Sequence, residues 1–143
     1  MYNKNILLYV SIVLFSFIVL LSDSTNIIKL AYLHFLADYV ITTPKMQIHK
    51  AEGRIEGIAL HSSVHAILIF IYFLYITENW MIALTLSLGE FWWHNFQDHA
   101  KSWVNRNIWG NPGTREYWII FGLDQYLHIY AKYVWLLMVA NWS

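Results

Sequence analysis

The sequence contains no cysteine, so disulfide bonds, thiolate metal ligands and cysteine nucleophiles are all excluded. Proline occurs twice and glycine six times in 143 residues, which leaves long stretches without helix-breaking residues. Charged residues make up only 13% of the chain, against about 25% in a typical soluble domain. Any metal or acid–base chemistry must therefore use histidine, aspartate, glutamate and lysine.

Hydrophobic residues, by contrast, are abundant. They form 58% of the chain, above the usual ~45–50%, and the mean hydropathy is +0.41. Nine basic and nine acidic side chains give a net charge of zero, which argues against a nucleic-acid-binding surface. This composition is typical of a membrane protein, and 143 residues leave no room for a second globular unit beside several membrane spans.

The apolar stretches predict an all-α polytopic membrane protein with about five transmembrane helices. They cover residues 5–21, 26–43, 58–76, 80–99 and 117–139. We interpret 1–25 as an N-terminal membrane anchor helix and 26–143 as a four-helix transmembrane domain. Within this domain, the segment 100–116 is expected to be a connector along the membrane interface.

The basic residues predict the orientation of these spans, because cytoplasmic loops of membrane proteins collect lysine and arginine. With five spans, one side of the membrane receives seven of the nine basic residues: Lys4, Lys45, Lys50, Arg54, Lys101, Arg106 and Arg115. We therefore expect a protein of the bacterial cytoplasmic (inner) membrane, with its N-terminus in the cytoplasm and its C-terminus outside.

Each of the last four predicted spans contains one pair of metal-ligand residue types at a spacing of four. The pairs are His34 and Asp38, His61 and His65, His94 and Asp98, and Asp124 and His128. Residues at i and i+4 lie on the same face of a helix. When the alternating helix directions are taken into account, all eight side chains lie in the cytoplasmic half of the bundle. Ionisable groups are costly inside a membrane, so eight that can converge need a common partner.

A divalent metal, one or two ions, is the partner that this set of residues favours. Imidazole with carboxylate suits zinc best, with iron or manganese as alternatives. Asp38 and Asp124 are the residues expected to bridge ions or to hold a ligating histidine through a hydrogen bond. A relay for protons or ions and a purely structural polar network remain as alternatives.

Three residues are candidates for catalysis at this site, and one of them, Asp98, is also a candidate ligand. Asp98 and Glu90 are candidates for the general base, Glu90 because it lies one turn before His94. An interhelical hydrogen bond is the alternative role for Glu90. Lys101 is three residues after Asp98 and can balance an anionic substrate, or it can extend to the membrane interface.

These motifs resemble those of a family of small, uncharacterised polytopic membrane proteins from bacteria and phages. The similar segments are "HFLADYV", the His-rich start of the next helix, the HxxxDxxK pattern at His94, Asp98 and Lys101, and "DQYLH" at 124–128. The resemblance covers residues 30–135. The chain departs from it at Thr42, where the family pattern has glutamine. The family is similar to inner-membrane metal-dependent hydrolases, which implies hydrolase chemistry by analogy.

The leading functional hypothesis is an integral membrane metal-dependent hydrolase, with membrane lipids as its partners and a lipid or lipid-linked ester or phosphoester as its substrate. A metal-ion or proton transporter is the first alternative. The second is a non-enzymatic membrane interaction protein stabilised by metal, which a phage can encode. Formation of a chemical product would indicate the hydrolase, and flux across a membrane would indicate the transporter. Metal-dependent folding without turnover would indicate the interaction protein.

Overall fold

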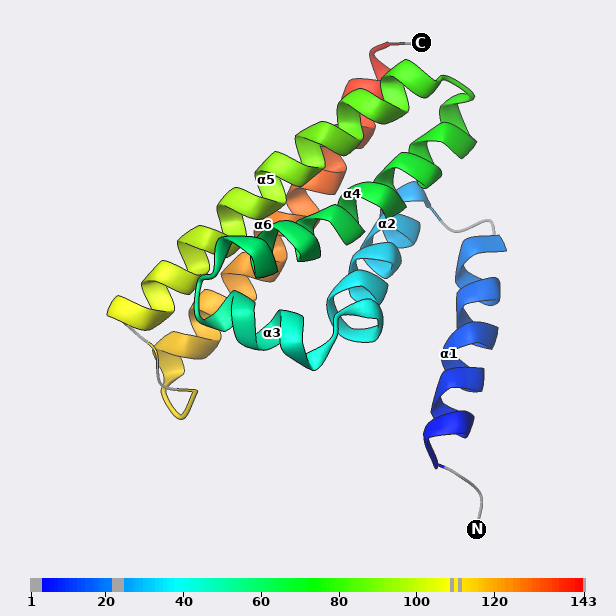
Figure 1. Ribbon diagram of the computed structural model, residues 1–143. Coiled ribbons are helices and arrows are strands. Elements are labelled where there is room, and N and C mark those ends of the chain that lie inside the picture. The colour runs from blue at the N-terminus through cyan, green and yellow to red at the C-terminus, as the bar shows by residue number, and fades with distance from the viewer. Residues whose placement is uncertain (1–3, 22–24, 109, 111, 143) are drawn as a thin grey trace.

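The computed structural model of the protein describes residues 4–21, 25–108, 110 and 112–142, and this part of the chain is helical with no strand. Figure 1 shows the elements in chain order. They are α1 (Lys4–Leu21), α2 (Asn26–Phe35), the π-helix η1 (Leu36–Ile41), α3 (Pro44–Ala51), α4 (Ile55–Thr77), α5 (Trp80–Asn107) and α6 (Arg115–Ala140). The predicted all-helical class is confirmed.

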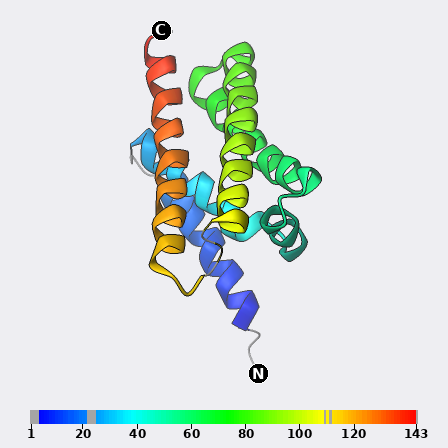
Figure 2. The same ribbon diagram turned by 90° about the vertical axis from the view of Figure 1, so that its left-hand side faces the viewer.

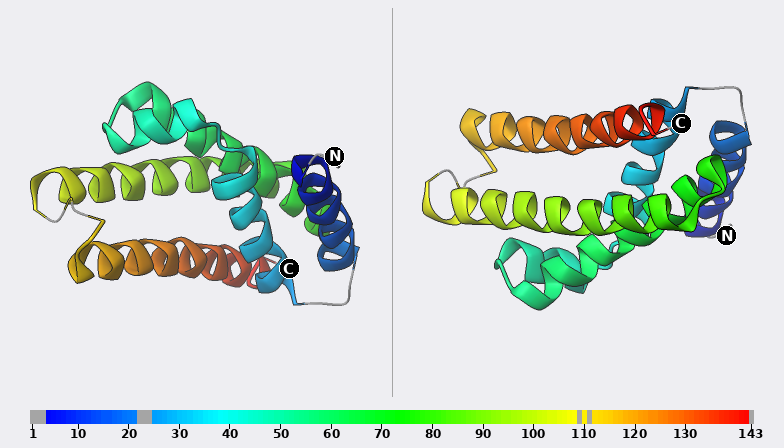
Figure 3. Two further views of the ribbon diagram at one scale, coloured as in Figure 1. Left: turned by 90° about the horizontal axis from the view of Figure 1, so that it is seen from below. Right: turned by 90° about the horizontal axis from the view of Figure 1, so that it is seen from above.

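The long helices α4, α5 and α6 form a bundle with α2, and α5 and α6 run side by side in opposite directions (Figures 2 and 3). Helix α1 stands apart at one edge (Figure 1). It is attached to α2 through Tyr32, whose hydroxyl lies 2.7 Å from the Ser16 hydroxyl and whose ring packs edge-on against Phe15. The described part of the expected N-terminal anchor is therefore a separate helix on the edge of the bundle.

Short polar residues fix where several helices begin. Thr43 caps α3 by accepting a hydrogen bond from the Met46 amide, and Pro44 follows it in the first turn, where a missing N–H costs nothing. Asn79 caps α5 through the amides of Met81 and Ile82. These caps satisfy amide groups that have no partner inside the helix.

One end of the bundle is filled by apolar side chains from α2, α4 and α5. The buried members of this apolar core are Leu30, Leu33, Ile69, Tyr72, Phe73, Ala83 and Leu86. They come from the middle and second half of α2, the second half of α4 and the first turns of α5. Polar and ionisable residues are concentrated toward the other end.

A buried ion pair joins α5 to α6 between these two regions. The Lys132 ammonium contacts Glu90 Oε1, and both side chains are 1% exposed. The indole N–H of Trp135 donates to Glu90 Oε2 at 2.9 Å. Of the two roles considered for Glu90, the structure shows the interhelical hydrogen bond.

The sequence-based boundaries differ from the structure in three places. The stretch 26–43 is an α-helix followed by a π-helix, and the expected loop 44–57 contains helix α3. Helix α5 continues to Asn107, eight residues past its expected end, so the first half of the 100–116 connector belongs to α5. Hydropathy falls at this point, but glycine and proline are absent until Gly110, and a polar helix can therefore continue.

Only α4 among the described helices is both long and apolar enough to cross a membrane by itself, and Val10–Leu21 is a shorter apolar segment. The five membrane spans therefore remain a prediction. Large side chains nevertheless face outward along the bundle, among them Trp92, Phe96, Trp118 and Tyr126.

The buried pair between Glu90 and Lys132 gives a prediction for stability. Either Glu90→Gln or Lys132→Met leaves one buried group without its partner, so each variant should lose about 3 kcal/mol of unfolding free energy. The double variant should lose less than the sum of the two single losses. Unfolding in detergent, followed by circular dichroism, measures the three values. Additive losses would contradict a direct pairing.

Candidate metal centre

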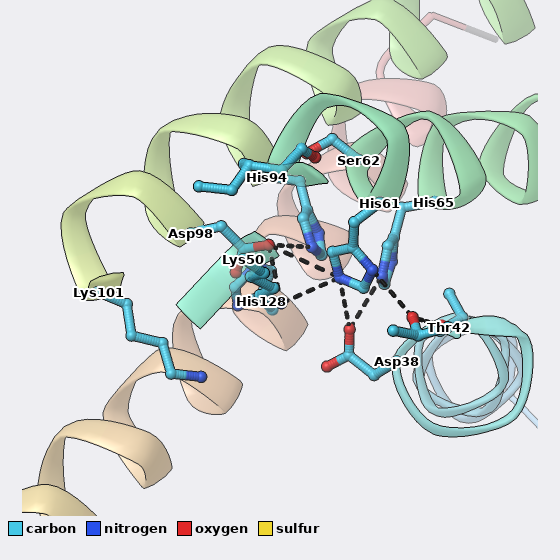
Figure 4. Close-up of polar contacts among 12 residues, drawn as sticks. Asp38, Thr42, Lys50, His61, Ser62, His65, His94, Asp98, Lys101 and His128 are labelled. Carbon is cyan, nitrogen blue, oxygen red and sulfur yellow. Dashed lines mark hydrogen bonds and ion pairs between the residues drawn. The ribbon is translucent and has the colours of Figure 1, made fainter. Parts of the chain in front are cut away.

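The four pairs predicted from the sequence come together from α2 and η1, α4, α5 and α6. Five imidazoles form one buried cluster, which we call the histidine cluster: His34, His61, His65, His94 and His128. Its closest rings are those of His65 and His94, whose centroids are 3.7 Å apart. The ring centroids of His94 and His128 are 4.2 Å apart. Figure 4 shows His61, His65 and His94 side by side with Asp38 beneath them.

Asp38 is the carboxylate that contacts most of this cluster. Its Oδ1 lies 3.0 Å from the Nε2 atoms of both His61 and His65, and its Oδ2 lies 3.4 Å from Nε2 of His34. Asp38 belongs to the π-helix η1. Turns of π-helix are rare in proteins, and those that occur are often found at functional sites. Gln125 donates a further hydrogen bond to Oδ2 at 3.2 Å.

Asp98 approaches the cluster from α5, together with a lysine that the sequence analysis did not select. Its Oδ2 lies 3.4 Å from Nε2 of His94, 3.6 Å from Nε2 of His61 and 2.8 Å from Nζ of Lys50. Lys50 comes from α3. Burial disfavours its charged form, but the carboxylates of Asp98 and Asp38 outweigh this effect and raise the pKa of Lys50 above its ordinary value. The ammonium is therefore retained at neutral pH.

The hydrogen bonds around His61 decide which of its two ring nitrogens carries the proton. Its Nδ1 lies 3.0 Å from the Thr42 hydroxyl, and that hydroxyl already donates its hydrogen to the carbonyl of Ala37. The Thr42 oxygen can then only accept, so Nδ1 of His61 carries the proton. In the neutral ring, Nε2 presents its lone pair to the Lys50 ammonium, 3.0 Å away, and also faces the carboxylates of Asp38 and Asp98.

His128 is held in the same sense. Nδ1 of His128 donates to the main-chain carbonyl of Asp124 at 2.7 Å, whereas Nδ1 of His94 lies 3.5 Å from Glu90 Oε1 without forming a hydrogen bond. Nε2 of His128 is buried without a hydrogen-bond partner among the described residues. This arrangement is the one that metal-binding histidines adopt, with one nitrogen held by an oxygen and the other free to bind.

Two groups of residues in this cluster can hold a metal ion. The first is Asp38, His61, His65 and His94, and the second is His94, Asp98 and His128; in each group the ligand atoms lie within 4.8 Å of one another. Lone pairs and carboxylate oxygens that face each other repel unless a cation lies between them. Lys50 supplies one positive charge, 3.0 Å from Nε2 of His61 and 2.8 Å from Oδ2 of Asp98, and a divalent ion can supply the rest.

Not every predicted residue contributes to these groups. The carboxylate of Asp124 pairs with Lys101 at 2.6 Å, and its other oxygen is 3.6 Å from Nδ1 of His128, so it supports the cluster from outside. Glu90 is engaged by Lys132 and Trp135. His34 lies against the cluster through its ring and Asp38, but it belongs to neither group. Figure 4 shows the Lys101 ammonium well away from the histidines.

A cavity of about 690 Å³ opens onto one side of the cluster, between α3, α5 and the start of α6. Asp38 and His61 are the cluster residues that line it. Lys50, Lys101 and Arg106 also line it, so three cations surround the route to the cluster. A small anionic group in this cavity would meet positive charge first and the histidines next.

The comparisons with known proteins do not identify the chain. No family model, no curated protein and no solved structure matches it. The chemistry of the centre must therefore be argued from its residues.

Proposed function

We propose that the protein is a membrane-embedded, metal-dependent hydrolase that cleaves an ester or phosphoester of a lipid or lipid-linked molecule. The observation that carries this proposal is the set of histidine Nε2 atoms that face two carboxylates beside an open cavity, with the opposite ring nitrogens of His61 and His128 held by hydrogen bonds. A cluster built only for packing would not need a cavity lined by Asp38 and His61.

The first group, Asp38, His61, His65 and His94, is the proposed ligand set for a single ion. His94 belongs to both groups, but its Nδ1 faces Glu90, so only Nε2 is available for metal binding. Imidazole and carboxylate ligands favour zinc. When bound, such an ion lowers the pKa of a coordinated water toward ~7 and polarises the ester that is attacked.

Asp98 is the proposed general base. Its Oδ2 lies among His61, His94 and Lys50, and it does not belong to the first group. A carboxylate there can accept the proton of the attacking water. The Lys50 ammonium, which lines the cavity and contacts Asp98, can then stabilise negative charge on the substrate.

The membrane setting is supported by composition and by the outward-facing side chains. Trp92 is 69% exposed and Phe96 64%, both on α5, and Tyr126 on α6 is 62% exposed. Contiguous exposed apolar surface marks a membrane or protein contact. A cluster buried in such a bundle is accessible to lipid headgroups that enter the cavity from the interface.

Transport is less well supported, because the polar region does not continue through the bundle. The apolar core of Leu30, Leu33, Ile69 and their neighbours fills the end away from the cavity. An ion that entered through the cavity would meet this core beyond the histidines. A metal used only to fasten helices would not explain why three cations line one cavity beside the cluster.

Metal content gives the first test of the proposal. Protein purified in detergent should contain about one zinc per chain, and His61→Ala and Asp38→Asn should each lower this at least tenfold, because each removes a ligand of the first group. Elemental analysis measures the content, and His99→Ala, on α5 but outside both groups, is the control. Zinc retained in both ligand variants would contradict the proposed site.

Turnover gives the second test, with bacterial total lipid extract as the probe. Wild-type protein should deplete one lipid species by mass spectrometry, and a chelator should prevent this. Asp98→Asn should keep its zinc but lose activity by about 10²–10⁴-fold, because a general base contributes roughly that factor. Unchanged turnover in Asp98→Asn, or an equal loss of zinc and turnover, would exclude Asp98 as the base.

A further inference from the structure

A second hollow runs along the outside of α5 and α6, next to the cavity. This groove has a volume of about 230 Å³, and most of its lining is apolar: Trp93, Phe96, Ala100, Val104, Ile120, Leu123 and Leu127. Lys101 lines both the groove and the cavity, and Asp124, its ion-pair partner, also lines the groove. The two hollows therefore meet at Lys101, one of them apolar and the other lined by cations.

Gln97 is an uncharged polar residue in the lining of the groove. Its side chain is 94% buried, as its relative exposure is 6%, yet neither Oε1 nor Nε2 has a hydrogen-bond partner among the described residues. Leaving such a buried amide unpaired costs about 1–3 kcal/mol per group. A ligand that brings a carbonyl and a hydroxyl or N–H into the groove would satisfy both atoms.

The cations at the cavity are held in place by their neighbours. The Arg106 guanidinium packs over Gly53, whose φ of +68° and missing side chain leave the room it occupies. Lys101 uses one of its three N–H donors on Asp124 and lies over the ring of Phe121. Together they form a positioned site for an anionic group.

From these observations we infer that the protein binds an anionic acyl lipid across both hollows. The phosphate lies in the cavity near Lys101 and Arg106, the acyl chain lies in the α5–α6 groove, and the acyl carbonyl accepts a hydrogen bond from Gln97 Nε2. A hydroxyl beside the acyl ester donates to Gln97 Oε1. This inference names the substrate class of the proposed hydrolase, but binding of the lipid does not depend on turnover.

Binding of a monoacyl glycerol phosphate to the full-length protein in detergent tests the inference, with dissociation constants from titration by native mass spectrometry. Gln97→Leu should weaken binding about tenfold, the effect of one or two hydrogen bonds. The same substitution should weaken binding of the alkyl-ether analogue, which keeps the hydroxyl but has no carbonyl, by a smaller factor than it weakens binding of the ester. Equal losses for the ester and the ether would overturn the role of Gln97.

The groove and the cations have matched controls. Ile120→Trp fills the groove and should weaken binding at least tenfold, whereas Ile119→Trp, one residue earlier on α6 and outside the groove, should not. Arg106→Gln should weaken the phosphate lipid but not the neutral monoacylglycerol. Equal affinity of the wild type for the phosphate and neutral lipids, or equal effects of the two tryptophans, would overturn the inference.

Zinc content, measured on the same samples, separates this inference from the proposed function. Protein that contains zinc and depletes a lipid from the extract, but does not distinguish the probe lipids, would refute the inference and leave the hydrolase intact. Protein that binds the phosphate lipid as described but contains no metal would refute the hydrolase and leave the lipid site standing.

Discussion

The repulsion between imidazole lone pairs and carboxylates, brought together away from water, is the constraint on which the rest of the structure depends. The Thr42 oxygen can only accept a hydrogen bond from His61, so Nδ1 of His61 carries the proton, and the Asp124 carbonyl places the proton on Nδ1 of His128 in the same way. The opposite nitrogens therefore face the interior, where Asp38 and Asp98 also lie. Positive charge placed among these groups makes such a gathering favourable. Lys50 supplies part of this positive charge, and the proposed metal ion supplies the rest.

The remainder of the fold serves to keep that gathering in place and accessible from one side. An apolar core closes one end of the bundle, and the buried contact of Glu90 with Lys132 and Trp135 ties α5 to α6 behind His94. Glu90 thus holds the helices and faces His94 at once. At the opposite end, α3 brings Lys50 to the cluster, and the cavity opens beside it. A sealed end and an open end suit a site that a substrate enters and leaves by the same route.

Much of the site followed from spacing alone, because residues at i and i+4 on a helix must share a face. The pairs on α4 and α5, and their convergence with His34, Asp38 and His128, were predicted in this way. Contacts between helices were not predictable. Lys50 lies on α3, which was predicted to be a loop because its sequence is polar. The pairings Glu90–Lys132 and Asp124–Lys101 depend on how the helices are rotated relative to each other, which the pattern within one helix does not determine. The π-helix was not predicted either, although Thr42 continues the four-residue spacing of His34 and Asp38.

The central claim is that histidines from separate helices and Asp38 bind one metal ion. X-ray absorption spectroscopy at the zinc edge of the purified protein tests this most directly. We expect a first shell of nitrogen and oxygen atoms at about 2.0–2.2 Å, with outer-shell scattering from two or three imidazole rings. An ion surrounded by oxygen alone, without imidazole scattering, or the lack of any metal edge, would contradict it.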